Sequence, residues 1–116
     1  MTGKRHKVEW TETALEDLLH LVSYIHVDSP PNAARVLDRL EKAAGSLDRF
    51  PLRGRIPPEL LHLGVRAYRE IIIRPYRIVY RVTEPSVVIL AVVDSRRDLA
   101  DLLLERMLRD TFSEKG

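Results

Sequence analysis

The sequence predicts an α+β protein in which a helical hairpin packs on one face of a twisted antiparallel sheet, in the order β-αα-βββ-α. Two amphipathic segments with apolar residues at helical spacing, 12–28 and about 30–49, are separated only by Ser29. Three apolar or alternating runs follow at 65–73, 76–82 and 87–93. Because the turns between these runs are short, we expect the strands to pair in sequence as an antiparallel meander.

The N-terminal part predicts a short strand followed by a capped helix. Residues Lys7–Trp10 alternate between polar and apolar types, which is typical of a strand. We expect this strand to join the sheet, because an isolated strand would leave its backbone groups unpaired. Thr11 or Thr13 can cap the helix that follows, and Thr13 with Glu16 fits a capping box.

The second helix has clear signals at both ends. Ser29 can cap it, and Pro30 suits the first helical position, where a missing N–H is no loss. It ends before Phe50, because Pro51 disfavours a helical residue ahead of it. Helices joined so closely pack antiparallel. Residues 51–65 contain three prolines and two glycines, which predict a loop with one helical turn at 58–62.

The C-terminal half predicts the sheet and a last helix. Tyr76 and Tyr80 share their parity with apolar residues, so we expect both rings to pack under the hairpin. The run at 87–93 is apolar throughout, which predicts a central strand covered on both faces. Asp98 can cap a helix over about 98–110. The length of 116 residues predicts a single domain, 1–116, with its core over about 7–100.

The composition excludes several classes of site. The chain has no cysteine, which rules out a disulfide framework, a Cys-ligated zinc site and a thiol nucleophile. Its four histidines are scattered, and no H-E-x-x-H, P-loop or G-x-S-x-G motif occurs. We therefore expect no metal and no cofactor. The longest apolar run has seven residues and no secretory signal is seen, so we expect a cytoplasmic protein with no membrane partner.

The charge is divided unevenly along the chain. The net charge is only +2, but residues 49–81 carry eight Arg against two Glu, and residues 11–48 carry seven acids against three bases. A local excess of this size predicts an anionic partner, either nucleic acid or an acidic polypeptide. The alternative is that these arginines only line the solvent face of the sheet.

Arginines on or beside the predicted strands are the candidate partner-binding residues. They are Arg66, Arg69, Arg77, Arg81, Arg96 and Arg97. Alternation places Arg77 and Arg81 on one face, about 13 Å apart along the strand. The register between strands decides whether Arg69 lies beside them. Such a face, with Tyr68, Tyr76 and Tyr80 interleaved among the arginines, could hold a phosphate backbone and stack a base. It could equally form salt bridges with the acids of a peptide partner.

Five short segments carry a family resemblance. They are Val8-Glu9-Trp10-Thr11-x-x-Ala14-x-x-Asp17-Leu18, Phe50-Pro51-x-x-Gly54-Arg55, Arg69-Glu70-Ile71, Pro75-Tyr76-Arg77-Ile78-Val79-Tyr80-Arg81 and Val88-Ile89-Leu90-x-Val92-x-x-x-Arg96-Arg97-Asp98. In this order they resemble the ParE/RelE toxin superfamily of type II toxin–antitoxin modules, over about residues 7–100. The Pro-Tyr-Arg-Ile-Val-Tyr strand and the Arg-Arg-Asp ending are more similar to the ParE, or plasmid-stabilisation, branch than to RelE.

The resemblance implies one fold with two activities. ParE-type toxins are held to act on DNA gyrase by binding, whereas RelE-type toxins cleave mRNA on the ribosome. A RelE-type enzyme would use arginines such as Arg55, Arg69 and Arg81 to stabilise the phosphorane. Where many relatives have His or Tyr at the end of the last strand, this chain has Asp94, a poor general acid at neutral pH. That difference favours the ParE-type activity.

The resemblance also implies partners. The expected antitoxin is acidic in its C-terminal half and wraps a helix and an extended segment over the toxin in a hetero-oligomer. The expected target is DNA gyrase, with the ribosome and mRNA as the alternative. A third alternative is a non-toxic family member that binds only its antitoxin.

Overall fold

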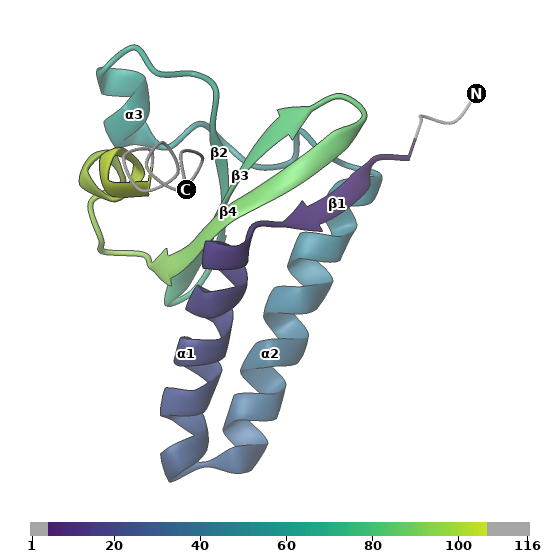
Figure 1. Cartoon of the computed structure of the whole chain (residues 1–116), viewed down its shortest axis with the longest axis vertical. Coiled ribbons are helices and arrows are strands. Elements are labelled where there is room, and N and C mark those ends of the chain that lie inside the picture. Colours follow the sequence, from purple (N-terminus) through teal and green to yellow (C-terminus); the bar gives the residue numbers. More distant parts are fainter. Residues whose placement is uncertain (1–4, 107–116) are drawn as a thin grey trace, which may run out of the picture.

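Residues 5–106 are described by the computed structural model, which has a four-stranded sheet with a helical hairpin on one face (Figure 1). The elements are β1 (Lys7–Trp10), α1 (Glu12–Asp28), α2 (Pro30–Gly45), the 3-10 turn η1 (Ser46–Asp48), α3 (Pro58–His62), β2 (Arg69–Ile73), β3 (Tyr76–Thr83) and β4 (Ser86–Asp94). Residues 99–106 form a further helix. The predicted α+β architecture is confirmed, including the bounds of the first helix and of the short helix at 58–62.

Side-chain caps fix the start of both hairpin helices. The Thr11 hydroxyl accepts the N–H of Ala14 at 3.1 Å, so the predicted capping box on Thr13 is wrong and the cap lies two residues earlier. The Ser29 hydroxyl accepts the N–H of Asn32 at 3.2 Å, as predicted. Because Ser29 also ends α1, a single residue joins the two helices and forces them antiparallel.

The sheet is mixed, which corrects the prediction of a wholly antiparallel one. Its strand order is β1-β4-β3-β2, and the meander of β2, β3 and β4 is antiparallel as expected. β1 lies parallel to β4, with Lys7 opposite Ser86 and Trp10 opposite Ile89. Parallel neighbours need a long connection, and the hairpin and the meander together supply it. β4 is therefore a central strand, as its apolar run predicts.

β2 is shorter than predicted, because residues 65–68 lead out of α3 without pairing with β3. The N–H of Val65 bonds the carbonyl of Leu60 at 2.8 Å and closes the end of α3. Pairing with β3 begins only where Arg69 lies opposite Tyr80 and ends where Ile73 lies opposite Tyr76.

The core lies on both faces of the sheet. Ile78 and Tyr80 of β3 pack under the hairpin with Leu40 of α2, and Tyr76 packs against the same cluster, which confirms the predicted role of both tyrosines. Val79 on the other parity packs against residues 99–106. We call these the hairpin face and the far face. The part of the predicted last helix after residue 106 lies outside the described residues.

A bulge in β4 lies where α1, β4 and residues 99–106 are in contact. Val79 lies opposite Ala91 and Tyr80 opposite Ile89, so Leu90 is an extra residue in β4. Its carbonyl accepts a hydrogen bond from Arg106 at 2.8 Å, and Arg106 also pairs with Asp17 of α1 at 2.8 Å. These contacts hold residues 99–106 against the sheet.

Candidate functional site

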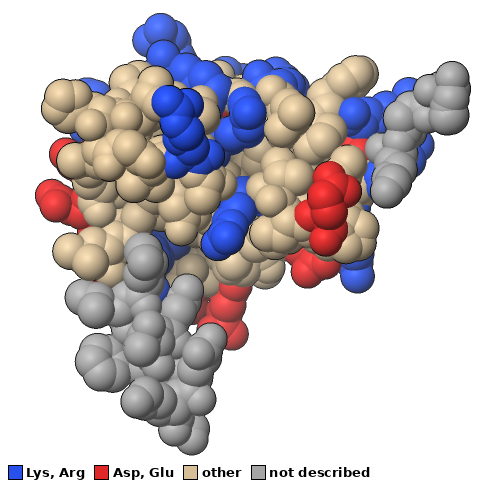
Figure 2. All heavy atoms as spheres, turned by 90° about the horizontal axis from the view of Figure 1, so that it is seen from above, with Lys and Arg blue, Asp and Glu red and all other residues tan. Residues whose placement is uncertain are grey.

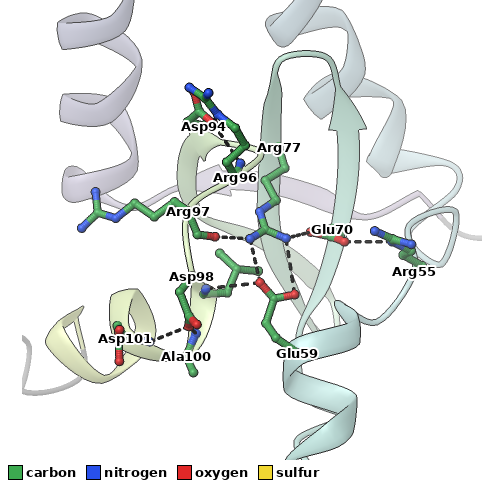
Figure 3. A network of polar contacts seen from close by, with 11 residues as sticks. Arg55, Glu59, Glu70, Arg77, Asp94, Arg96, Arg97, Asp98, Ala100 and Asp101 are labelled. Carbon is green, nitrogen blue, oxygen red and sulfur yellow. Dashed lines mark hydrogen bonds and ion pairs between the residues drawn. The ribbon is translucent and has the colours of Figure 1, made fainter.

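Arg77 lies in a buried ion cluster on the far face (Figure 3). Its guanidinium donates to Glu70 at 2.9 Å, to Glu59 at 2.7 Å and to the carbonyl of Arg97. Glu70 is buried too, and it also accepts from Arg55 at 2.8 Å. Burial acts to lower the pKa of Arg77, but the hydrogen bonds to Glu59 and Glu70 raise it above its ordinary value. Arg77 therefore stays a cation at neutral pH.

The structure corrects the assignment of Arg77 as a partner-binding residue. Its side chain is only 5 % exposed, and two carboxylates and a carbonyl accept hydrogen bonds from its two terminal nitrogens. Glu59 also accepts the N–H of Leu99 at 3.3 Å. The cluster thus attaches the chain after β4 to β2, β3 and α3, which is a structural role. The sequence contained a signal for it, since Glu59 and Glu70 are the only acids among eight arginines in residues 49–81.

Arg81 has the opposite environment, although it shares the far face with Arg77. Its side chain is exposed, and its guanidinium carbon lies 5.9 Å from the centre of the Tyr68 ring. That distance is within the range of a cation–π contact. Tyr68 packs against the far-face cluster, so the ring gives Arg81 a fixed platform.

Arg69 does not share a face with Arg81. It lies directly opposite Tyr80, whose ring is under the hairpin, so the strand alternation places Arg69 on the hairpin face. Its guanidinium donates to the carbonyl of Gly54 at 2.7 Å. The two arginines therefore lie on opposite sides of the outer corner that the start of β2 and the end of β3 form.

The loop after the hairpin is held against this corner. The buried Tyr80 hydroxyl donates to the carbonyl of Pro51 at 2.7 Å and accepts the N–H of Gly54 at 2.9 Å. Arg55 exchanges two backbone hydrogen bonds with Glu70. A Cβ at Gly54 would lie 2.5 Å from the carbonyl of Glu70, so no larger residue fits. Burial raises the pKa of Tyr80, so its phenol stays protonated at neutral pH and cannot act as a base.

Unpaired arginines gather around the corner. Within residues 5–106, six arginines of the basic segment have no carboxylate partner: Arg49, Arg53, Arg66, Arg69, Arg74 and Arg81. The two acids of the segment are taken up by Arg55 and Arg77, so these six carry its whole excess of charge. Arg74 lies at the other end of β2. We call four of the others the arginine edge: Arg53 and Arg69, with their hydrogen bonds to Ser46 and Gly54, Arg81 over the Tyr68 ring, and the exposed Arg66, two residues before Tyr68. Figure 2 shows Lys and Arg gathered on the strand side of the molecule, with few acids between them.

Arg96 and Arg97 lie away from the arginine edge, at the other end of β4. Arg96 pairs with Asp94 at 3.1 Å, and Arg97 lies 3.7 Å from Glu105. Hydrogen bonds from Arg96 hold the pKa of Asp94 below its ordinary value. Asp94 therefore stays ionised and cannot donate a proton at neutral pH.

A groove also lies at this end of β4. It has a volume of about 440 Å³ and is lined by residues that include His20, Tyr24, Tyr76, Asp94 and Arg97. Tyr76 and Arg81 are five residues apart on β3, which corresponds to about 17 Å. The proton-exchanging groups of the groove, His20, Tyr24, Tyr76 and Asp94, are thus remote from the arginine edge. The phenols near that edge are Tyr68 and the buried Tyr80.

Residues 5–106 contain neither a candidate metal site nor a helix that could span a membrane. No three His, Asp or Glu side chains there form a group that could hold a metal ion. No helix in the same range is long and apolar enough to cross a membrane.

Comparisons with known proteins identify relatives over most of the chain. The family model for the ParE toxin of type II toxin–antitoxin systems matches residues 8–99. Y4kP of Sinorhizobium fredii, named as a toxin, is 33% identical over 101 residues, which is 85% of this chain and 98% of the relative. Toxin RelE2 of Caulobacter vibrioides is 37% identical over 92 residues, which is 78% of this chain and 97% of the relative.

Solved structures show the same fold. The chromosomal ParDE system of Pseudomonas aeruginosa superposes with a TM-score of 0.65 at 20% identity, over 78% of this chain and 96% of the other. The toxin–antitoxin complex RelBE2 of Mycobacterium tuberculosis superposes with a TM-score of 0.52 at 31% identity, over 78% and 92%.

Proposed function

The chain belongs to the ParE toxin family of type II toxin–antitoxin systems, and we propose that it inhibits DNA gyrase by binding rather than by cutting a substrate. One observation carries the proposal: the arginine edge and the groove with His20, Tyr24 and Asp94 lie at opposite ends of the sheet, and the arginine that lines the groove, Arg97, is paired with Glu105. Cleavage of RNA needs a cation and a proton-exchanging group at one phosphate. Binding needs only the exposed cations. We expect both partners, gyrase and the antitoxin, to be cytoplasmic.

The proposed antitoxin is an acidic protein that docks on the loop beside the arginine edge. Phe50 and Leu52 are 62% and 63% exposed, and Arg49 and Arg53 flank them. This order of cationic and apolar side chains complements a segment in which acidic and apolar residues alternate. The two structural relatives come from a ParDE system and a RelBE2 toxin–antitoxin complex, which supports a hetero-oligomer of this kind.

Ribosome-dependent cleavage of mRNA is the second candidate. It is favoured by the relative named Toxin RelE2 and by the Tyr68–Arg81 contact, which places a phenol beside a cation. In that case Arg55, Arg69 and Arg81 would be the catalytic candidates, although Arg55 is paired with Glu70 and Arg69 and Arg81 occupy different faces.

A tightly controlled expression experiment separates these activities. Filamentation with gyrase–DNA cleavage complexes and intact mRNA is expected for the proposed function. Rapid, ribosome-dependent cutting of mRNA would contradict it and support the second candidate. Normal growth without either effect would show a family member that only binds its antitoxin. Co-expression of the acidic protein encoded next to the toxin should restore growth in either toxic case.

A further inference from the structure

We propose that the arginine edge binds the phosphate backbone of duplex DNA, so that the toxin contacts the DNA held by gyrase as well as the enzyme. The inference rests on the proposed function, because it names the part of the gyrase–DNA complex that this surface contacts. It concerns Arg53, Arg66, Arg69 and Arg81, together with Tyr68 as a positioning residue.

The charge of this surface is uncompensated. The only two acids of residues 49–81 point into the ion cluster, where they pair with Arg55 and Arg77. The other arginines of the segment have no carboxylate partner among the described residues, and a guanidinium that donates to a carbonyl or a hydroxyl keeps its charge. Arg69 donates to the Gly54 carbonyl and Arg53 to the Ser46 hydroxyl, both at 2.7 Å. Such a surface attracts an anion of high charge density, and duplex DNA is one.

The arginines are also positioned before any partner binds. Arg81 lies over the Tyr68 ring, and the ring packs against the far-face cluster. Arg53 and Arg69 are both close enough to lower the pKa of Tyr80, against the larger effect of burial. Tyr80 therefore has cations near it on the hairpin face, and Arg81 follows it on the far face. A guanidinium held in this way binds phosphate oxygens with less loss of side-chain entropy than a free one.

An acidic polypeptide fits this surface less well than DNA does. Protein interfaces need a buried apolar core besides their charges. Among the described residues, none of the exposed large apolar side chains belongs to β2 or β3. Between α2 and β2, the exposed large apolar residues are Phe50 and Leu52, in the loop that we assign to the antitoxin, and Leu61 and Leu63 at the end of α3. The corner itself offers cations and one stacked ring, which are the groups that contact a nucleic-acid backbone.

The hairpin carries an excess of acids, so the charge of the molecule is asymmetric between the hairpin and the sheet corner. Residues 11–48, which form α1, α2 and η1, carry seven acids against three bases. A DNA duplex repels this end of the molecule and attracts the sheet corner, so electrostatic steering presents the arginine edge first.

The test is the binding of purified toxin, without gyrase, to a fluorescein-labelled DNA duplex of about 24 base pairs, followed by anisotropy at several salt concentrations. If three phosphates are contacted, the logarithm of the binding constant should fall with the logarithm of salt with a slope of about −3. The double variant Arg66→Glu/Arg81→Glu should bind at least about tenfold more weakly and lose about 2 from that slope. The control Arg35→Glu/Arg39→Glu makes the same charge change on α2 and should bind almost as the wild type does.

Tyr68 gives a second readout that a general charge effect would not move. Tyr68→Phe keeps the ring under Arg81 and should retain affinity, whereas Tyr68→Leu keeps an apolar side chain against the far-face cluster but removes the ring and should weaken binding, with the thermal unfolding midpoint of each variant measured in parallel.

Three results would overturn the proposal: no binding of the duplex at 100 mM salt, equal weakening by the α2 control, or tighter binding of a single-stranded RNA of the same length. Because this assay contains no gyrase, its failure differs from failure of the proposed function. A toxin that poisons gyrase without binding free DNA would keep the proposed function and lose this inference. A toxin that binds DNA but leaves supercoiling unchanged would keep the DNA-binding surface and lose the proposed function.

Discussion

Arg77 and Arg81 are the same residue type on the same face of the same strand, yet they have opposite environments. Arg77 is buried and binds two carboxylates and a carbonyl, whereas Arg81 is exposed and has only the Tyr68 ring beside it. α3 and residues 99–106 cover the far face around Arg77, and they leave the end of β3 uncovered. What covers a strand, rather than its own pattern, decides whether an arginine there stabilises the fold or binds a partner.

The largest expected effect is the loss of the buried arginine. Arg77→Leu leaves Glu59 and Glu70 in the interior with fewer donors, so the free energy of unfolding in urea should fall by about 3–5 kcal/mol. Amide exchange at Leu99 should also speed up, because Glu59 accepts its N–H. Adding Glu59→Gln and Glu70→Gln should restore part of the stability. A loss below about 1 kcal/mol for Arg77→Leu would show that the cluster is not structural.

The attachment of the loop comes next in size. Tyr80→Phe removes the hydroxyl that donates to the Pro51 carbonyl in a part-buried contact and accepts the Gly54 N–H in a buried one, and should cost about 1–3 kcal/mol in urea unfolding. Trypsin should then cut faster after Arg53, since the loop is less firmly held. Tyr24→Phe removes a hydroxyl from a tyrosine that is 81% exposed, and should change neither measurement.

A smaller effect is expected from acid. Burial acts to raise the pKa of Glu59, but the hydrogen bonds from Arg77 and from backbone N–H groups outweigh it and hold the pKa below 4.5. A carboxyl with a depressed folded-state pKa contributes stability above its unfolded pKa and loses it as the pH falls through the lower folded value. Stability should therefore decline below about pH 4.5, and Glu59→Gln should flatten the profile there. An unchanged pH profile of the variant would refute this linkage.

The smallest effect on stability belongs to the exposed arginine. Arg81→Ala should change the free energy of unfolding by no more than about 0.5 kcal/mol, because no carboxylate among the described residues depends on it. Growth inhibition should nevertheless weaken in cells that express the variant at the wild-type level. Arg35→Ala on α2 is the matched control and should leave both stability and growth inhibition unchanged. Full toxicity of Arg81→Ala would remove Arg81 from the target-binding surface.

The candidate site could be predicted only in part. The local charge of residues 49–81 indicated the basic surface, and the spacing of the strand indicated that Arg77 and Arg81 share a face. Neither feature distinguishes a buried cation from an exposed one. The face on which Arg69 lies depended on the register between β2 and β3. A shift of one residue from its pairing with Tyr80 would place the Arg69 side chain on the other face of the sheet.

The sequence by itself determined the local elements. Helical spacing with caps at Thr11 and Ser29, the Pro58 start of α3 and the apolar run of β4 depend on neighbours within a few residues, where backbone geometry and solvation act directly. The tertiary structure decided the parallel position of β1 and the burial of Arg77. One of the two carboxylates that bind Arg77 comes from Glu59, 18 residues away in another element. A charge is buried only where other chain segments supply its counter-charge, and the local sequence pattern does not determine which segments pack together.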